Sequence, residues 1–136
     1  MRSTNRKAWT RILQPPQKNG ENKFNASLCL ASDGTRLRSR LELRRYEELR
    51  LLQRSGQIEG LRTNTRWPLR IAAVELGAYE SDFDYIEYGE RVIEDCKGYV
   101  QDGQGRRPVT YRLFLLKKGL MQALYGITVR EIHRAG

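Results

Sequence analysis

The clearest pattern of apolar and polar positions lies in residues 39–55, where apolar side chains recur every three or four residues. Ser39 is a good N-cap, and Glu42 follows three residues later, as in a capping box. Gly56 comes directly after the pattern and can end a helix. The pattern therefore predicts a helix over 39–55. Glu42 lies near the edge of its apolar stripe, in line with Tyr46.

Shorter stretches rich in β-branched and aromatic residues predict strands. We expect strands in three such stretches, near 67–74, 79–87 and 91–99. Residues 24–31 alternate only weakly and are expected to form a short strand or an extended segment. Turn signals at Ser32-Asp33-Gly34 and breaks at Gly77 and Gly89 separate them. The last two stretches flank Tyr88-Gly89-Glu90 and are expected to form a hairpin.

The C-terminal third reads as a loop, a helix and a final strand. Residues 101–107 are polar and contain glycine, Pro108 can open a helix, and Gly126 can end it. Residues 127–132 close as a strand. The order β, α, β, β, β, α, β predicts an α/β domain, with a central mixed sheet flanked by helices. Residues 1–23 are polar and basic and are interpreted as a flexible N-terminal arm, whereas 24–136 are expected to form one domain.

The charge balance limits the classes of partner that the protein is expected to bind. Lys and Arg total 25 against 16 Asp and Glu, a formal net charge of +9. A domain this basic usually binds a polyanion, with nucleic acid as the first candidate and an anionic membrane surface as the second. No apolar stretch approaches the ~20 residues of a membrane helix, and the N-terminus has no secretory h-region. We therefore expect a cytoplasmic protein with no membrane partner.

Cysteine usage adds little chemistry. Cys29 and Cys96 have no CxxC spacing, and His133 is the only further soft ligand, so a structural zinc site is not expected. Two free thiols in a reducing compartment are the simpler interpretation. Cys96 is expected to pack inward and to be chemically idle.

Acidic residues gather around the predicted hairpin. Because side chains alternate along a strand, Asp95 and Lys97 should share one face and Glu94 the other. Asp82 and Asp84 likewise share a face of the preceding strand, so Asp82 can approach Asp95 across the hairpin. Neighbouring carboxylates repel unless a proton or a cation intervenes. Oxygen ligands of this kind suit Mg²⁺ or Mn²⁺.

A lysine beside such a pair has a chemical use. A divalent ion lowers the pKa of bound water, and Lys97 could orient that water or stabilise charge on phosphorus. Glu42 could reach the mouth of the hairpin as a third acid, or it could serve only as the capping partner of Ser39. Asp84 is expected to be solvent-exposed or a local hydrogen-bond acceptor, and Glu94 to be an ion-pairing residue.

These residues bring a family resemblance into view. The run Ser81-Asp82-Phe83 followed by Glu94-Asp95-Cys96-Lys97-Gly98 resembles the D…(D/E)-x-K signature of the PD-(D/E)XK nuclease superfamily. The stretches DGTRLRSRLELRRYEELRLLQRSGQIEGL and YESDFDYIEYGERVIEDCKGY resemble small phage and prophage proteins. The spacing from Asp82 to Lys97 is similar to that of RecU-type Holliday-junction resolvases. The resemblance covers about Phe24 to Ile132.

The resemblance implies a restriction-endonuclease-like core and a nuclease site. Asp82, Asp95 and Glu42 would bind Mg²⁺ or Mn²⁺, and Lys97 would position or activate water. The products would carry 5′-phosphate and 3′-hydroxyl ends, in phage recombination, replication or packaging. There are departures: Ser81 replaces the proline before the first acid, and residues 64–68 lack a Gln-Pro found in family members.

Basic residues next to the hairpin suggest how DNA would be held. Five of them lie before or within the last predicted helix and are candidates for phosphate contact: Arg106, Arg107, Arg112, Lys117 and Lys118. For any single one, a solvated helix face is the simpler interpretation. Trp9 and Trp67 could stack on bases, although Trp67 beside Pro68 in a strand favours packing.

The sequence thus predicts a metal-dependent DNA endonuclease, which would be structure-selective if it resolves branched DNA. A branched-DNA resolvase is one option and would imply a homodimer that cuts two strands symmetrically; a nickase or a single-strand nuclease is another. The main alternative is a non-catalytic basic nucleic-acid-binding phage protein, in which no acid cluster is needed. A third hypothesis, a phage protein that binds a protein partner, predicts a large exposed apolar patch. The sequence does not obviously provide one.

Overall fold

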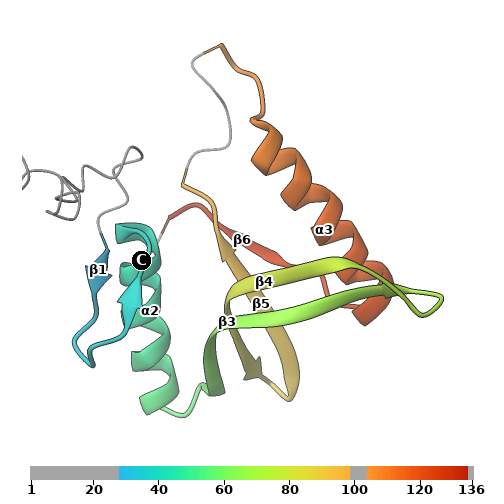
Figure 1. Ribbon diagram of the computed structural model, residues 1–136. Coiled ribbons are helices and arrows are strands. Elements are labelled where there is room, and N and C mark those ends of the chain that lie inside the picture. The colour runs from blue at the N-terminus through green and yellow to red at the C-terminus, as the bar shows by residue number, and fades with distance from the viewer. Residues whose placement is uncertain (1–27, 99–103, 135–136) are drawn as a thin grey trace, which may run out of the picture.

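The computed structural model describes residues 28–98 and 104–134 (Figure 1). Its elements, in chain order, are β1 (Cys29–Leu30), β2 (Arg36–Leu37), α2 (Arg40–Arg54), β3 (Ile58–Ile71), β4 (Val74–Glu87), β5 (Glu90–Cys96), α3 (Val109–Tyr125) and β6 (Arg130–Ile132). The expected α/β class is confirmed. The predicted arm over 1–23, with Trp9, lies outside the described residues, as do residues 24–27 of the first predicted strand.

A four-stranded mixed sheet forms the centre of the fold. Its strand order is β3-β4-β5-β6, with β3–β4 and β4–β5 antiparallel and β5–β6 parallel. A parallel pair requires a crossover connection, and α3 lies in that crossover. The short strands β1 and β2 form a separate antiparallel pair beside α2 (Figure 1). The helix predicted over 39–55 and the hairpin around Tyr88-Gly89-Glu90 are confirmed.

Two apolar clusters lie on opposite sides of β5. Phe83 and Tyr85 pack with Tyr46 and Leu49 of α2. Tyr79, Leu69 and Ile93 instead pack with Phe114 and Met121 of α3 and with Val129. Because successive side chains of a strand point to opposite faces, β5 directs Ile93 toward the α3 side. Its neighbours Val92 and Cys96 pack against the α2 cluster.

The bounds of the β3–β4 hairpin correct the predicted strand over 67–74. β3 begins at Ile58 and ends at Ile71, and the turn is formed by Ala72 and Ala73, at φ 48° and 67°. Turns with two positive φ values usually carry Asn-Gly or Gly-Gly, so an Ala-Ala turn gives no sequence signal. Gly77, expected to break the strand, lies within β4.

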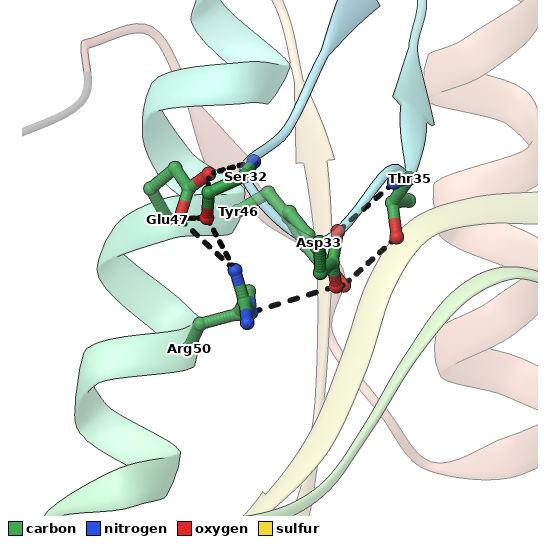
Figure 2. Close-up of polar contacts among 6 residues, drawn as sticks. All are labelled: Ser32, Asp33, Thr35, Tyr46, Glu47 and Arg50. Carbon is green, nitrogen blue, oxygen red and sulfur yellow. Dashed lines mark hydrogen bonds and ion pairs between the residues drawn. The ribbon is translucent and has the colours of Figure 1, made fainter.

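A polar network holds the turn after β1 against α2 (Figure 2). The Tyr46 hydroxyl donates a 2.7 Å hydrogen bond to Asp33, whose other carboxylate oxygen accepts the Thr35 amide at 2.9 Å. The Ser32 amide and hydroxyl donate to Glu47 at 2.8 and 3.0 Å. Arg50 approaches Asp33 at 3.5 Å. Asp33 and Tyr46 therefore have a structural role, which is to hold the turn after β1 against the middle of α2.

The expectation that Asp84 is solvent-exposed is wrong, because its side chain is fully buried. It instead acts as a hydrogen-bond acceptor. Arg62 of β3 and Arg91 of β5 reach it from the two neighbouring strands at 2.5 and 2.7 Å, and Thr65 donates to its other oxygen at 2.5 Å. A carboxylate can be buried in this way because opposite charges and donors compensate for lost water.

No helix in residues 28–98 and 104–134 is long and apolar enough to cross a membrane.

Candidate active site

Asp95 and Lys97 lie at the C-terminal end of β5 and point to the same side, as the strand alternation predicted. The Lys97 ammonium lies 2.8 Å from Oδ1 of Asp95. It also lies 4.1 Å from the ring centroid of Phe114 of α3. The Asp95 side chain is nearly buried, whereas about a quarter of the Lys97 side chain is exposed. Solvent therefore reaches the pair mainly through the Lys97 side chain.

Asp82 joins this pair from β4. The pairing of β4 with β5 ends at Phe83–Glu94. Beyond that point, Oδ2 of Asp82 accepts a 2.7 Å hydrogen bond from the Cys96 amide. The Asp82 carboxylate thus takes the place of a backbone carbonyl as the acceptor for the Cys96 amide, and this hydrogen bond holds Asp82 beside Asp95. In β3, Asn64 lies opposite Asp82 and has a φ of 51°.

The negative charges of Asp82 and Asp95 repel each other. The pKa of Asp82 is raised from 3.8 to about 7, first by burial and then by the negative charge of Asp95. Glu42 adds to this rise, whereas the Cys96 amide and the Lys97 charge oppose it. An ordinary surface carboxylate has neither the burial nor the like-charged neighbour that raises a carboxyl pKa in this way. The site therefore concentrates more negative charge than its single lysine compensates.

Tyr79 is a site residue that the sequence reasoning did not single out. Its hydroxyl donates a 2.8 Å hydrogen bond to Oδ2 of Asp95, and both groups are buried. Burial, together with Asp95, raises the pKa of Tyr79 well above its usual value, so the phenol stays protonated and donates. The available signal in the sequence was its position three residues before Asp82, in the same predicted strand. The hydrogen bond fixes one oxygen of Asp95 and leaves the other facing Lys97.

Glu42 serves the helix cap. The Ser39 hydroxyl accepts the Glu42 amide at 3.1 Å, and the Glu42 carboxylate accepts the Arg38 amide at 3.0 Å. The predicted capping role is confirmed, although the carboxylate binds the amide before Ser39 and not that of Ser39 itself. The same carboxylate is close enough to raise the pKa of Asp82. Glu42 therefore lies at the rim of the acidic site while it caps α2.

The donor set is compatible with a hard divalent cation. Among the described residues, no group of three or more His, Cys, Asp or Glu side chains is arranged to hold a metal ion. Mg²⁺ keeps several waters and commonly binds through one or two carboxylates together with substrate phosphates. The mutually repelling pair of the partly buried Asp82 and the buried Asp95 fits that mode, because a cation would relieve the repulsion that helps to raise the pKa of Asp82.

On the other side of β5, Glu94 is confirmed as an ion-pairing residue. Its buried carboxylate receives two hydrogen bonds from Arg45 of α2, at 2.6 and 2.9 Å, and one from the Tyr85 hydroxyl at 2.6 Å. This contact joins α2 to β5 one residue before Asp95. The neighbouring Cys96 thiol has a raised pKa because of burial and then the charge of Asp82. As expected, it is a neutral thiol packed among apolar side chains.

The predicted DNA-contact residues fall into two groups. Arg106, Arg107 and Arg112 are exposed and line a hollow at the start of α3. Lys118 instead donates a 2.7 Å hydrogen bond to Glu131 of β6, whose carboxylate also accepts a hydrogen bond from the Tyr111 hydroxyl. Its ammonium thus has a partner within the fold. Lys117 is half-buried.

Trp67 contributes to packing, as its place in a strand suggested. Its indole N–H donates to the Ser81 hydroxyl at 3.2 Å, and its ring meets that of Tyr125 edge-on at 5.4 Å. The contact joins the middle of the β3–β4 hairpin to the end of α3.

The chain matches no protein-family model, no curated protein and no solved structure. The resemblance to PD-(D/E)XK nucleases therefore rests on the residues of this chain alone.

Proposed function

We propose that this protein is a Mg²⁺-dependent endonuclease that hydrolyses DNA phosphodiester bonds, with a PD-(D/E)XK type of site. The observation that carries the proposal is the convergence of Asp82, Asp95 and Lys97 at the end of β5. A protein that only binds DNA gains nothing from holding a buried and a partly buried carboxylate in repulsion next to a polyanion. The alternative of a non-catalytic nucleic-acid-binding protein leaves that arrangement unexplained.

Asp82 and Asp95 would hold the cation, with Glu42 at the rim of the site. When bound, Mg²⁺ would polarise a phosphate oxygen and lower the pKa of a bound water. The hydrogen bond from Tyr79 keeps the Asp95 carboxylate in one orientation, and the Cys96 amide does the same for Asp82. Oriented carboxylates reduce the reorganisation needed when substrate enters.

Lys97 is the candidate for water positioning and for stabilising charge on the phosphorus. Its ammonium is fixed between Asp95 and the Phe114 ring while its side chain stays partly exposed. A cation in that position can act on a phosphate oxygen or on the attacking water without first being assembled.

The exposed arginines at the start of α3 would contact the DNA backbone. Arg106, Arg107 and Arg112 line one hollow, and α3 also contributes Phe114 beside Lys97. Phosphate contacts position a duplex without reading its sequence. A DNA shape, such as a branch point, is a better candidate for selectivity than a base sequence.

A cleavage panel tests the proposal. The full chain is incubated with supercoiled, linear, single-stranded and four-way-junction DNA, in Mg²⁺, Mn²⁺ or EDTA. We expect cleavage that depends on the metal and that is lost in Asp95→Asn and Lys97→Ala. Glu90→Gln is the matched control, because Glu90 is an exposed acid at the other end of the same strand. Cleavage in EDTA, or unchanged cleavage in both variants, would contradict the site; DNA binding without cleavage of any substrate would favour the non-catalytic alternative.

A further inference from the structure

Asp95 has a second carboxylate as its neighbour, on strand β6. The parallel pairing of β5 with β6 places Glu131 beside Asp95. Paired residues of neighbouring strands share a face of the sheet, and the strands lie about 4.8 Å apart. The Lys97 backbone is fixed against β6, because its N–H donates to the Ile132 carbonyl at 2.8 Å and its carbonyl accepts from Nδ1 of His133 at 2.7 Å. The Lys97 side chain alone therefore decides which of the two carboxylates its ammonium joins.

Both oxygens of Glu131 already have donors, and these donors come from α3. The Tyr111 hydroxyl donates to Oε1 and the Lys118 ammonium to Oε2, each at 2.7 Å. Nε2 of His133 lies farther from Oε1, at 3.7 Å. Burial alone would raise the pKa of Glu131, but the hydrogen bonds from Lys118 and Tyr111 lower it. Glu131 is therefore a charged group, with a side chain only 16% exposed, whose partners are Tyr111 and Lys118.

The Lys97 ammonium is left to Asp95 and to the Phe114 ring, at 2.8 Å from Oδ1 and 4.1 Å from the ring centroid. Tyr111 precedes Phe114 by three residues and Lys118 follows it by four, so the three side chains project from one side of α3. The same side of α3 thus supplies the ring that contacts Lys97 and the two donors that occupy Glu131.

We propose that Tyr111 and Lys118 are positioning residues of the candidate site, which occupy Glu131 so that Lys97 stays paired with Asp95. Two neighbouring carboxylates share two lysines, and the geometry assigns one lysine to each. Without Lys118, the mostly buried Glu131 would lack a cation, and an uncompensated buried charge is costly. Lys97, with its long and flexible stem, would then turn from Asp95 to Glu131.

A simpler alternative is that the same contacts only clamp α3 to β6. The two accounts differ in the double variant Lys118→Met/Glu131→Gln. If Glu131 competes for Lys97, removal of its charge restores the pairing of Lys97 with Asp95. If the contacts are only a clamp, the double variant stays at least as disturbed as Lys118→Met. The inference deepens the proposed function and rests on it for cleavage, but the position of Lys97 can be measured without DNA or metal.

Proton NMR of the Lys97 ε-methylene group, in the full chain and in EDTA, tests that position. An aromatic ring facing the ammonium shifts these protons upfield, and Lys97→Arg identifies their signal. We expect an upfield signal in the wild-type protein, loss of most of this shift in Lys118→Met, and its return in Lys118→Met/Glu131→Gln. Arg66→Met is the matched control, because Arg66 pairs with Glu75 in the β3–β4 hairpin and should leave the signal unchanged.

Three NMR outcomes would overturn the proposal. They are an ordinary lysine signal in the wild-type protein, an unchanged upfield signal in Lys118→Met, and a double variant that resembles Lys118→Met. Tyr111→Phe removes only a hydroxyl and should lose part of the shift. This variant takes the place of Lys118→Met, alone and combined with Glu131→Gln, if far-UV circular dichroism shows that Lys118→Met does not fold.

Single-turnover cleavage of four-way-junction DNA, at saturating protein and Mg²⁺, is the second readout. The rate should fall by about tenfold to a hundredfold in Lys118→Met, as for a misplaced catalytic group, and recover in the double variant. Saturating protein keeps a weaker phosphate contact from lowering the rate. A rate that falls in Lys118→Met and does not recover would contradict the positioning role. If the wild-type protein cuts no DNA, the proposed function fails, and the NMR signals still decide whether Tyr111 and Lys118 position Lys97.

Discussion

Lys97 and Asp95 form an ion pair of 2.8 Å between Nζ and Oδ1, although both belong to the same strand end and lie two residues apart. Strand alternation places them on one side, where the Phe114 ring of α3 lies against the Lys97 ammonium. This pair gives the acidic site a fixed cation. The predictions below test how the surrounding residues maintain it.

Tyr79→Phe should weaken the site without destroying the fold. The change removes the hydrogen bond to Oδ2 of Asp95 and leaves the ring packed near Phe114. We expect a loss of about 1–3 kcal/mol in the free energy of unfolding, as for other hydrogen bonds to charged groups. If the proposed function holds, kcat for DNA cleavage should also fall about tenfold because the carboxylate loses its orientation.

Denaturant unfolding and single-turnover cleavage measure these two effects. Tyr88→Phe is the control, because Tyr88 is almost fully exposed at the β4–β5 turn. A Tyr79→Phe protein with wild-type stability and wild-type cleavage would show that the hydroxyl does not position Asp95.

Asp82→Asn should stabilise the metal-free protein. Burial and Asp95 oppose the charge of Asp82, whereas an asparagine oxygen can still accept the Cys96 amide. Removing this partly buried charge should raise the free energy of unfolding by roughly 1–2 kcal/mol at neutral pH. Thermal melts in EDTA test this gain. The same variant should lose the stabilisation that Mg²⁺ or Mn²⁺ gives the wild-type protein. A lower melting temperature in EDTA would contradict the repulsion between the two carboxylates.

Arg45 and Glu94 should show strong energetic coupling. Glu94 is fully buried and receives two hydrogen bonds from Arg45. In Arg45→Met, the Glu94 carboxylate keeps only the hydrogen bond from Tyr85 and the more distant Arg130 as partners. The free energy of unfolding should fall by about 3–5 kcal/mol, the usual effect of breaking a buried ion pair. The double variant Arg45→Met/Glu94→Leu should recover part of that loss. A double-mutant cycle by urea unfolding measures the coupling; additive single effects would show that the pair is not coupled.

The turn after β1 should make stability depend on acid pH. Hydrogen bonds from Tyr46 and Thr35 lower the pKa of Asp33 from 3.8 to about 2 (Figure 2). A lowered folded-state pKa contributes stability above the unfolded value, and that stability is lost as pH falls toward the folded value. The wild-type protein should therefore exceed Asp33→Asn in melting temperature at pH 7, and the difference should shrink between about pH 4 and pH 2. A difference that stays constant through this window would contradict the assigned role of Asp33.

The sequence predicted those parts of the fold that depend on local patterns. Ser39 and the apolar spacing defined α2, and the alternation in β5 correctly separated Asp95 from Glu94. The extent of β3 was missed, since the Ala72-Ala73 turn owes its conformation to the paired strands and not to turn residues. β2, two residues long, was also missed.

Long-range contacts explain the remaining differences. Asp84 is buried because Arg62 and Arg91, from two other strands, reach it. Tyr79 is a site residue because β4 places its hydroxyl within hydrogen-bond distance of Asp95. No local periodicity encodes such pairings, because they depend on strand register.

The central claim is that Asp82, Asp95 and Lys97 form a metal-dependent nuclease site. The most direct test is the rate at which the full chain cuts four-way-junction and supercoiled DNA in saturating Mg²⁺, measured beside Asp95→Asn. We predict cleavage by the wild-type protein that EDTA abolishes, and a rate for Asp95→Asn lower by at least about a hundredfold, as for loss of a group acting in the transition state. Equal rates for the two proteins, or no cleavage of either DNA by folded wild-type protein, would contradict the claim.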